Sequence, residues 1–414
     1  MSSVKYQPHE TTLVLATPEQ RELISQVCYD YWIKETGASF RHYERAIEQG
    51  AHATEGRLQY FMQRDCLYRT SNTSCDAIES GISYVLEAVY TPPEHRRHGY
   101  ARHALRLLHY ILAIPTHLPP YPQDTFGPAP PVSTFSDCKS KGDVSFNDAL
   151  FSTLWSDVGR EYYARATIGD GEEERDGWVV YNDRSTVVTL ADSFEVSDGS
   201  SCTDGDNDGW QIRAYPSSIP LSQRTNRDRV RLQKHDALGK ALLVDTLTTP
   251  GALEYYLDRM SVSWPAKYLP DVQNTSVPLT QKVPSVLYLE PSSSSLDAPA
   301  GWAIFAPHFD EHPSLLHPPS PPTLDITDLH IPPCSPETFS KIAKNLLCRL
   351  AEQARQYECE KMEIWDADEA VLDVWREIKG VSVEQVEREM RLGAIAWYGP
   401  KEEVGQINVI SKQM

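Results

Sequence analysis

One strand–turn–helix segment constrains this chain more than any other part of its sequence. The apolar run Ile82 to Thr91 predicts a strand, and the amphipathic run Arg102 to Leu112 predicts a helix. The turn between them carries the pattern Arg-x-x-Gly-x-Ala, with Arg96, Gly99 and Ala101 at the named positions. Gly99 permits a left-handed backbone, and the small Ala101 lets a ligand approach the main chain closely.

Such a turn is suited to an anion, because the first N–H groups of a helix lack partners and the helix dipole adds positive charge there. The chain carries a net charge of −19 at pH 7, yet basic residues gather in this segment. They are Arg96, Arg97, His98, Arg102, His103, Arg106 and His109. A basic cluster in an acidic chain indicates a local phosphate or pyrophosphate ligand, since nucleic-acid binding needs a broad positive surface. The alternative is a solvated, arginine-rich helix start.

Two motifs in this order resemble those of the GNAT N-acetyltransferases. Arg96-x-x-Gly99-x-Ala101 after a strand is similar to their acetyl-CoA pyrophosphate loop. The segment Leu154 to Ala164 predicts a strand and then a helix with a tyrosine pair, which is also similar to that superfamily. The forms Thr-Pro-Pro-Glu-x-Arg-x-x-Gly-Tyr-Ala and Leu-Trp-Ser-Asp-Val-Gly most resemble fungal lysine N6-acetyltransferases, which implies a role in lysine catabolism.

The resemblance implies an α+β fold with a central mixed, mostly antiparallel sheet flanked by helices. It covers about residues 10–190 at the level of motifs and continues more loosely beyond them. We expect a GNAT domain over 1–193, with a proline-rich and mobile insertion at 114–149. An acidic linker at 194–215 and a C-terminal α+β domain over 216–414 follow.

The C-terminal domain predicts a second GNAT-like lobe, because its strand–helix–strand–helix–strand order repeats that of the first domain. The strands are expected at 285–289, 302–306, 324–331, 361–365, 381–386 and 392–398, with a helix after Ser335 and another ended by Gly380. Ile331 to Pro336 stands where a phosphate loop would be, so this lobe should not bind acetyl-CoA. An unrelated α+β domain is the alternative.

The resemblance also implies acetyl-CoA as acyl donor and no metal. Cofactor binding then falls on the strand end and the turn, namely on Val89, Tyr90, Thr91, Arg96, Arg97, His98, Gly99, Tyr100, Ala101 and Arg102. The pantetheine arm would pair with residues 89–91, and the N–H of Val89 or Tyr90 would face the thioester carbonyl.

Two side chains are candidates for catalysis. Tyr163 occupies the helix position where the family places the acid that protonates the leaving thiolate, with Tyr162 beside it as the alternative. Glu87 is the candidate base, since it shares a strand face with Val85 and Val89 and should be partly desolvated there. Core packing of the tyrosines, and deprotonation through ordered water, remain open.

The acceptor is expected to be the N6-amine of free L-lysine, by resemblance. We expect a first strand at Thr12 to Ala16, followed by a helix that Thr17 caps. This helix carries an apolar stripe of Leu23, Val27 and Tyr31. The segment from Tyr29 to Tyr43 should border the acceptor site. Helices are also expected near 229–260. A peptide, polyamine or other small amine is an alternative acceptor. A non-catalytic acyl-CoA-binding scaffold, docking through its proline-rich segment, is an alternative of another class.

Composition and apolar patterning indicate the cellular compartment. No apolar run approaches the ~18 residues of a membrane span, and the start of the chain lacks the apolar region of a signal peptide. Eight cysteines without Cys-x-x-Cys spacing are typical of reduced thiols. We therefore expect a cytoplasmic protein that binds neither nucleic acid nor membrane, and leave a homo-oligomer open.

Overall fold

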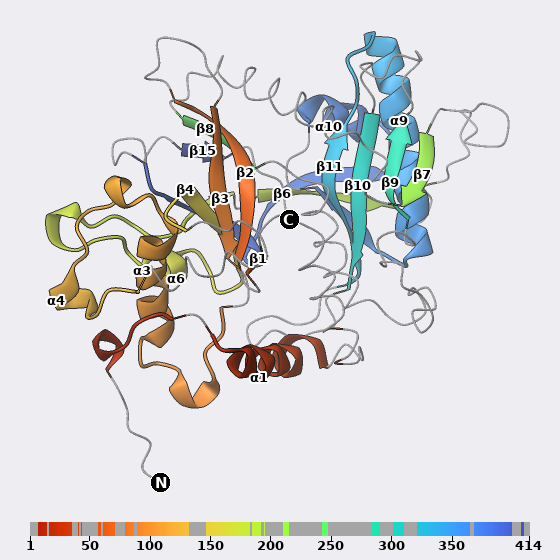
Figure 1. The fold of residues 1–414 in the computed structure, drawn as a ribbon. Coiled ribbons are helices and arrows are strands. Elements are labelled where there is room, and N and C mark those ends of the chain that lie inside the picture. Colours follow the sequence, from red (N-terminus) through yellow and green to blue (C-terminus); the bar gives the residue numbers. More distant parts are fainter. Residues whose placement is uncertain are drawn as a thin grey trace.

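The computed structural model contains two β-sheets, each with its own helices (Figure 1). It describes residues 7–14, 16–34, 40, 43, 57–58, 61–70, 79–86, 89–131, 146–182, 184–191, 194, 210–214, 242–246, 284–289, 301–309, 321–364, 368–399 and 407–409. The fold is α+β with mixed, mostly antiparallel sheets, as the sequence predicts.

The first sheet has the strand order β15-β8-β2-β3-β4-β14-β5, with β1 paired to β2. Its strands are β1 (Arg57–Leu58), β2 (Phe61–Thr70), β3 (Glu79–Leu86), β4 (Ala149–Ser156), β5 (Val179–Asn182), β8 (Leu242–Thr246), β14 (Leu392–Trp397) and β15 (Ile407–Val409). Helix α3 (Tyr100–Leu112) connects β3 to β4, which are parallel. The shorter helices α4 (Gln123–Phe126) and α6 (Glu161–Ala164) lie near α3, and α1 (Pro18–Cys28) precedes the sheet (Figure 1).

The second sheet has the order β13-β6-β12-β11-β10-β9-β7. Its strands are β6 (Arg184–Leu190), β7 (Trp210–Ala214), β9 (Pro284–Leu289), β10 (Gly301–His308), β11 (Thr323–His330), β12 (Lys361–Ile364) and β13 (Val381–Glu387). Helices α9 (Pro336–Gln356) and α10 (Glu369–Arg376) pack on it, and their buried leucines and Trp375 join the strands in one apolar core. The strands and helices expected between residues 285 and 398 are therefore confirmed.

The two sheets share one strand order, which confirms a repeated lobe. In the first, β2, β3 and β4 run side by side, with α3 between β3 and β4 and α6 after β4. In the second, β10, β11 and β12 run side by side, with α9 between β11 and β12 and α10 after β12. In each sheet, one strand from the other lobe is inserted before the last strand, β14 between β4 and β5 and β6 between β12 and β13.

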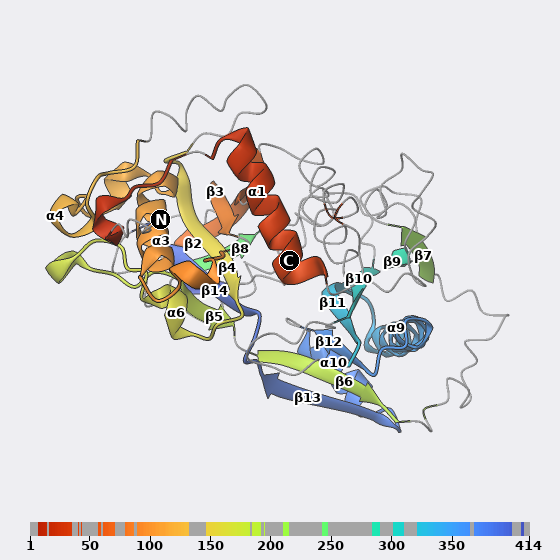
Figure 2. The ribbon, with the colours of Figure 1, turned by 90° about the horizontal axis from the view of Figure 1, so that it is seen from below.

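This exchange forms one antiparallel ribbon that crosses both sheets. β14 pairs with β5 in the first sheet, and β13 pairs with β6 in the second. The chain therefore crosses from β5 to β6 and returns from β13 to β14 at neighbouring places, as Figure 2 shows. A division of the chain at residues 193 and 216 does not separate the two sheets.

A buried polar network joins β14 to the first lobe. The His109 side chain of α3 stacks on Trp178, with ring centroids 4.2 Å apart. Its Nε2 lies 2.8 Å from the carbonyl oxygen of Ala166, which can only accept, so Nε2 carries the proton. Its Nδ1 then accepts from the Tyr398 hydroxyl at 3.2 Å. Because the ring is fully buried, its pKa falls to about 3 and it stays neutral.

The network closes on Ser152 of β4. The Tyr398 hydroxyl lies 2.5 Å from Ser152 Oγ, which also accepts from Trp178 Nε1 at 3.0 Å. The Ser152 hydroxyl can therefore donate to Tyr398 while Tyr398 donates to His109, so every member has a partner. A residue near the C-terminal end of the chain thus completes the core of the first lobe.

Several expectations are wrong. Residues 12–14 and 16 form no strand, although Thr17 and Gln20 cap α1 as expected. The apolar stripe expected on α1 is only partly buried, since Leu23 is 64% exposed while Val27 and Tyr31 are half-buried. Trp210–Ala214, expected in the linker, is a strand at the edge of the second sheet. Leu242–Thr246, expected among helices, is β8.

The proline-rich insertion is ordered over residues 114–131, contrary to the expected mobility. The ring of Tyr121 lies edge-on to that of Tyr110 in α3, with centroids 4.9 Å apart, and Phe126 is buried. Gly127 brings the insertion so close to the N-terminal segment that a Cβ there would lie 1.8 Å from the His9 carbonyl oxygen. Aromatic packing against α3 holds this part of the insertion in place. No helix among the described residues is both long and apolar enough to cross a membrane.

Candidate active site

Arg96 organises the turn between β3 and α3. Its Nε donates to the Thr91 carbonyl at 2.9 Å, which closes the turn on itself. Its guanidinium lies over the rings of Tyr31 and Tyr90, at 5.7 and 5.6 Å from their centroids. Tyr31 and Tyr90 themselves pack with centroids 4.8 Å apart. Arg96 therefore joins the turn to the segment that the sequence assigns to the acceptor side.

The backbone after Arg96 is left-handed at two positions. Arg97 has φ 65° and Gly99 has φ 84°, and Gly99 is the N-cap of α3 without a side-chain cap. The first helical hydrogen bond runs from the His103 N–H to the Gly99 carbonyl. In the part of the chain that the structure describes, the N–H groups of Ala101 and Arg102 have no partner.

These unpaired groups fit an anion. Arg97, His98, Gly99 and Arg102 are all exposed around the helix start, so a ligand could reach the N–H groups. The helix dipole and two guanidinium groups supply positive charge at the same place. The equivalent helix of the second lobe differs, because Ser335 Oγ accepts from the Thr338 N–H and Pro336 has no N–H. The anion-binding geometry is therefore a property of α3.

The rest of the predicted basic cluster serves the fold. His103 Nε2 lies 3.2 Å from the Thr11 carbonyl oxygen, and Arg106 Nη2 donates to Thr167 Oγ1 at 3.0 Å. His109 is the buried neutral ring described above. The positive charge of the turn comes from Arg96, Arg97 and Arg102.

The parallel pairing of β3 with β4 is described up to the residues that precede this turn, and Glu87 and Ala88 lie outside the described residues. Their pairing runs from Ile82 opposite Ala149 to Val85 opposite Thr153. β4 continues to Ser156 with β14 on its other side, while Val89 and Tyr90 belong to no strand. The last three residues of β4 therefore lack a described β3 partner, at the end of the sheet where α3 begins.

Tyr163 lies in α6, directly after β4. Its ring packs edge-on to Trp178 at 6.5 Å between centroids, and its carbonyl accepts from the Trp178 N–H at 3.2 Å. Within the described residues the hydroxyl makes no hydrogen bond. Burial raises the pKa of Tyr163, and the charges of Tyr162 and Asp157 raise it further. Tyr163 is therefore protonated at neutral pH.

Tyr162 connects α6 to the helix start. It is 43% exposed, and its ring lies edge-on to that of Tyr163 with centroids 5.1 Å apart. Partial burial raises the pKa of Tyr162, and the nearby Arg102 guanidinium opposes that rise. Tyr162 therefore lies within the electrostatic influence of the helix start, and Tyr163 packs directly beside it. Glu87 lies outside the described residues.

Aromatic rings also pack against one another within the segment from Tyr29 to Tyr43. Tyr29 contacts Phe40 and Tyr43, with centroids 5.2 and 5.9 Å apart. Asp30 is exposed, and its carboxylate pairs with Lys34 at 3.1 Å, which lowers the pKa of Asp30. No group of His, Cys, Asp and Glu suited to a metal ion occurs in the described ranges.

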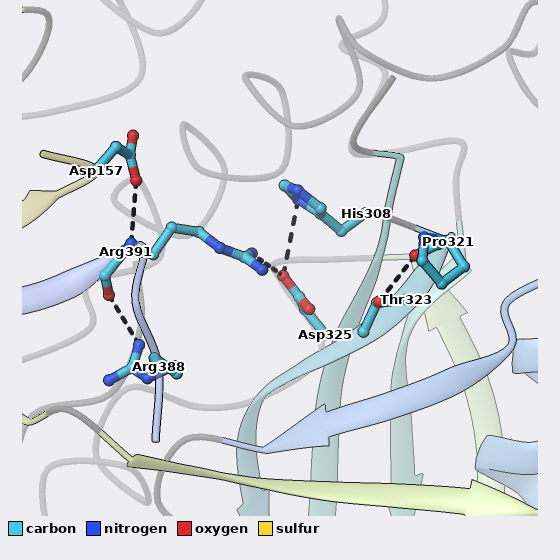
Figure 3. Close-up of polar contacts among 7 residues, drawn as sticks. All are labelled: Asp157, His308, Pro321, Thr323, Asp325, Arg388 and Arg391. Atoms are coloured by element: carbon cyan, nitrogen blue, oxygen red, sulfur yellow. Dashed lines mark hydrogen bonds and ion pairs between the residues drawn. The ribbon is translucent and has the colours of Figure 1, made fainter. Parts of the chain in front are cut away.

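Sequence reasoning missed Asp157 and Arg391, which meet at the end of β4. The Arg391 N–H donates to Asp157 Oδ1 at 3.0 Å, and Arg391 Nη1 lies 2.9 Å from Asp325 Oδ2 in β11 (Figure 3). A charged residue directly after a strand was the one local signal for Asp157. Arg391, more than 230 positions away, had none.

The comparison with family models gives one match. Residues 278–413 match the LYC1 GNAT-like C-terminal domain. This match covers β9 to β13 of the second sheet, with α9 and α10, and continues through β14 and β15. It supports the GNAT superfamily and an acetyltransferase activity in general. No curated protein shows a significant match to the sequence.

Proposed function

We propose that this protein is an acetyl-CoA-dependent N-acetyltransferase that acetylates the N6-amine of free L-lysine. One observation carries the proposal: α3, the helix that follows β3, starts on a left-handed glycine, and the N–H groups of Ala101 and Arg102 have no partner among the described residues. Such a helix start offers N–H groups to a diphosphate. The GNAT-like match in the second lobe supports the same class of reaction.

The donor would bind along the turn. The N–H groups of Ala101 and Arg102, with the exposed side chains of Arg97 and Arg102, would hold the diphosphate. The pantetheine arm would follow residues 89–91, where the N–H of Val89 or Tyr90 could stabilise the oxyanion that forms at the thioester carbonyl. Arg96 would keep the turn in shape through its bond to Thr91.

Proton transfer would involve both sides of the site. Only a neutral amine attacks a thioester, so Glu87 or an ordered water would take a proton from the acceptor ammonium. Tyr163 would donate its proton to the departing thiolate, and its raised pKa keeps that proton available at neutral pH. The acidic character of the chain, with a net charge of −19, favours a cationic acceptor over an anionic one.

Acetyl-CoA titration followed by a thiol-release assay tests this function. We expect binding by calorimetry and turnover with free lysine that exceeds turnover with lysine peptides, polyamines and other small amines. Binding without turnover on any amine would refute the enzyme, and preference for a peptide or polyamine would refute the acceptor.

Two variants assign the residues. Gly99→Val should weaken acetyl-CoA binding, because φ 84° is a backbone conformation that a β-branched residue avoids. An added Cβ at Gly99 meets only Pro8, at 3.7 Å, so the effect comes from the backbone and not from crowding. Tyr163→Phe should lower kcat by a factor of about 10² or more with the acetyl-CoA Kd unchanged. Tyr162→Phe is the matched control, and equal losses in both variants would contradict the assignment to Tyr163.

A further inference from the structure

Arg391 lies where the ribbon passes from the second sheet to the first. It follows β13 by four residues and immediately precedes β14. Its φ is 51°, a left-handed conformation that a residue other than glycine keeps only when its surroundings hold it. Arg391 contacts Asp325 of the second lobe, Asp157 after β4 of the first lobe, and Arg388 of its own connection (Figure 3).

The first contact fixes the side chain in the second lobe. Arg391 Nη1 lies 2.9 Å from Oδ2 of Asp325, whose side chain is fully buried in β11. The same oxygen lies 3.8 Å from His308 Nδ1. A buried carboxylate beside a guanidinium has one strongly preferred arrangement, because either charge alone would be costly to bury. Asp325 therefore gives Arg391 a rigid anchor.

The second and third contacts fix the backbone. Arg388 Nη1 donates to the Arg391 carbonyl at 2.8 Å, and the Arg391 N–H donates to Asp157 Oδ1 at 3.0 Å. The bond to a carboxylate is charge-assisted, so it is stronger than an ordinary backbone hydrogen bond. It ties the crossing ribbon to the loop between β4 and α6.

That loop leads directly to Tyr163. Ser156 Oγ donates to the Gly159 carbonyl at 2.7 Å and accepts from the Val158 N–H, which gives the loop a compact shape. Asp157 lies close enough to Tyr163 for its charge to act on the phenol. The position of Asp157 therefore affects both the path of the loop and the field at the hydroxyl.

We propose that Arg391, anchored by Asp325 of the second lobe, is a positioning residue that holds the β4–α6 loop so that Tyr163 meets the leaving thiolate. The inference rests on the proposed acetyltransferase function. It assigns the second lobe a task in the reaction although α9, the counterpart of α3 there, has a capped start. Arg391 acts through Asp157 and Tyr163 and contacts no substrate itself.

The substitution Arg391→Met tests the proposal, with Arg184→Met as the matched control. Arg184 lies on the same ribbon, in β6, and its exposed guanidinium is 4.0 Å from Glu387. We expect Arg391→Met to lower kcat on the order of tenfold, since small misplacements of a catalytic group cost one to two decades in rate. The acetyl-CoA Kd should stay unchanged, and Arg184→Met should match the wild type in both quantities. A wild-type kcat in folded Arg391→Met would overturn the inference.

A double-variant cycle separates positioning from a general loss of structure. If Arg391 acts through Tyr163, the double variant Arg391→Met, Tyr163→Phe should be no slower than Tyr163→Phe alone. Rate losses that multiply would overturn the inference, while turnover by the wild type would still support the proposed function. A wild type that turns over no amine would instead refute the proposed function.

A conservative variant keeps the test decisive if Arg391→Met does not fold. Arg391→Lys retains a charge for Asp325 but lacks the planar fork of the guanidinium. We expect a smaller fall in kcat than for Arg391→Met, and the same non-additivity with Tyr163→Phe. Either a full kcat in Arg391→Lys or a rate loss that multiplies with that of Tyr163→Phe in the double variant would overturn the proposal.

Discussion

The buried imidazole of His109 predicts a specific loss of stability in mild acid. In the folded protein its pKa is about 3, because the ring is fully buried, whereas an unfolded histidine titrates near 6.5. Between these values the unfolded chain binds one more proton than the folded protein at this site. Stability is therefore fully present above about pH 6.5 and is lost as the pH falls toward 3.

The size of this stability loss follows from how far the pKa of His109 is lowered. Each pH unit inside this window removes up to about 1.4 kcal/mol of unfolding free energy, and the whole window accounts for roughly 4–5 kcal/mol. We propose to measure it as a difference between the wild type and His109→Gln, which removes the titrating group but keeps an amide donor for Ala166. Between pH 6.0 and 4.5, the wild type should lose about 2 kcal/mol more than the variant.

Urea unfolding followed by tryptophan fluorescence gives the free energies at each pH, and carboxylate titrations cancel in the difference. Tyr398→Phe is the control, because it removes the hydroxyl that donates to His109 Nδ1 but leaves the imidazole. It should lower stability at every pH by about 1–3 kcal/mol and keep the wild-type slope. Equal slopes for the wild type and His109→Gln would refute the reasoning.

Three further predictions concern packing and caps. Gly177→Ala should lower the free energy of unfolding by about 1–3 kcal/mol in urea titrations, because the new Cβ would lie 2.3 Å from the Ala166 carbonyl oxygen; an unchanged midpoint would contradict the close approach. Gly127→Ala should release the N-terminal segment, seen as faster hydrogen exchange at the Glu10 and Thr11 amides, and unaltered exchange would count against it. Ser335→Ala should cost about 1 kcal/mol through loss of the α9 cap, and a cost near zero would argue that water replaces it.

Local patterns predicted most of the second lobe correctly. Ser335 followed by Pro336 fixes the start of α9, and an apolar stripe that includes Leu346 and Leu350 predicts its buried face. The same kind of signal predicts α1 from Thr17 and Gln20, because a capping box needs only residues three apart. The buried face of α1 could not be predicted, since it depends on what lies opposite Leu23 in space.

Strand partners were beyond local reasoning. The apolar run Leu392–Trp397 predicts a strand covered on both faces, and the structure buries it throughout. The run does not predict which sheet contains the strand. Its neighbours, β4 and β5, lie more than 200 residues earlier in the chain. The order of the insertion at 114–131 was missed for a related reason, because prolines indicate a loop while aromatic packing on α3 decides whether it is ordered.

Part of the candidate site was predictable. The turn motif, the left-handed glycine and the helix start are all local, so the sequence located them. The sequence did not predict the hydrogen bond of Arg96 to Thr91 or the neutral state of His109, because burial and carbonyl groups distant in the sequence determine them. Asp157 and Arg391 come together only through the crossing ribbon.

The reciprocal exchange of β6 and β14 has a consequence for anyone who divides this chain into fragments. A cut near residue 215 would leave β6 and β7 of the second sheet on the first fragment, and β8, β14 and β15 of the first sheet on the second fragment. The fragment that contains the family-model match would carry β14 without its strand partners, and β13 without its neighbour β6. Each fragment expressed alone should expose unpaired strand edges and aggregate. Co-expressed fragments should fold together, because each supplies strands that the other lacks.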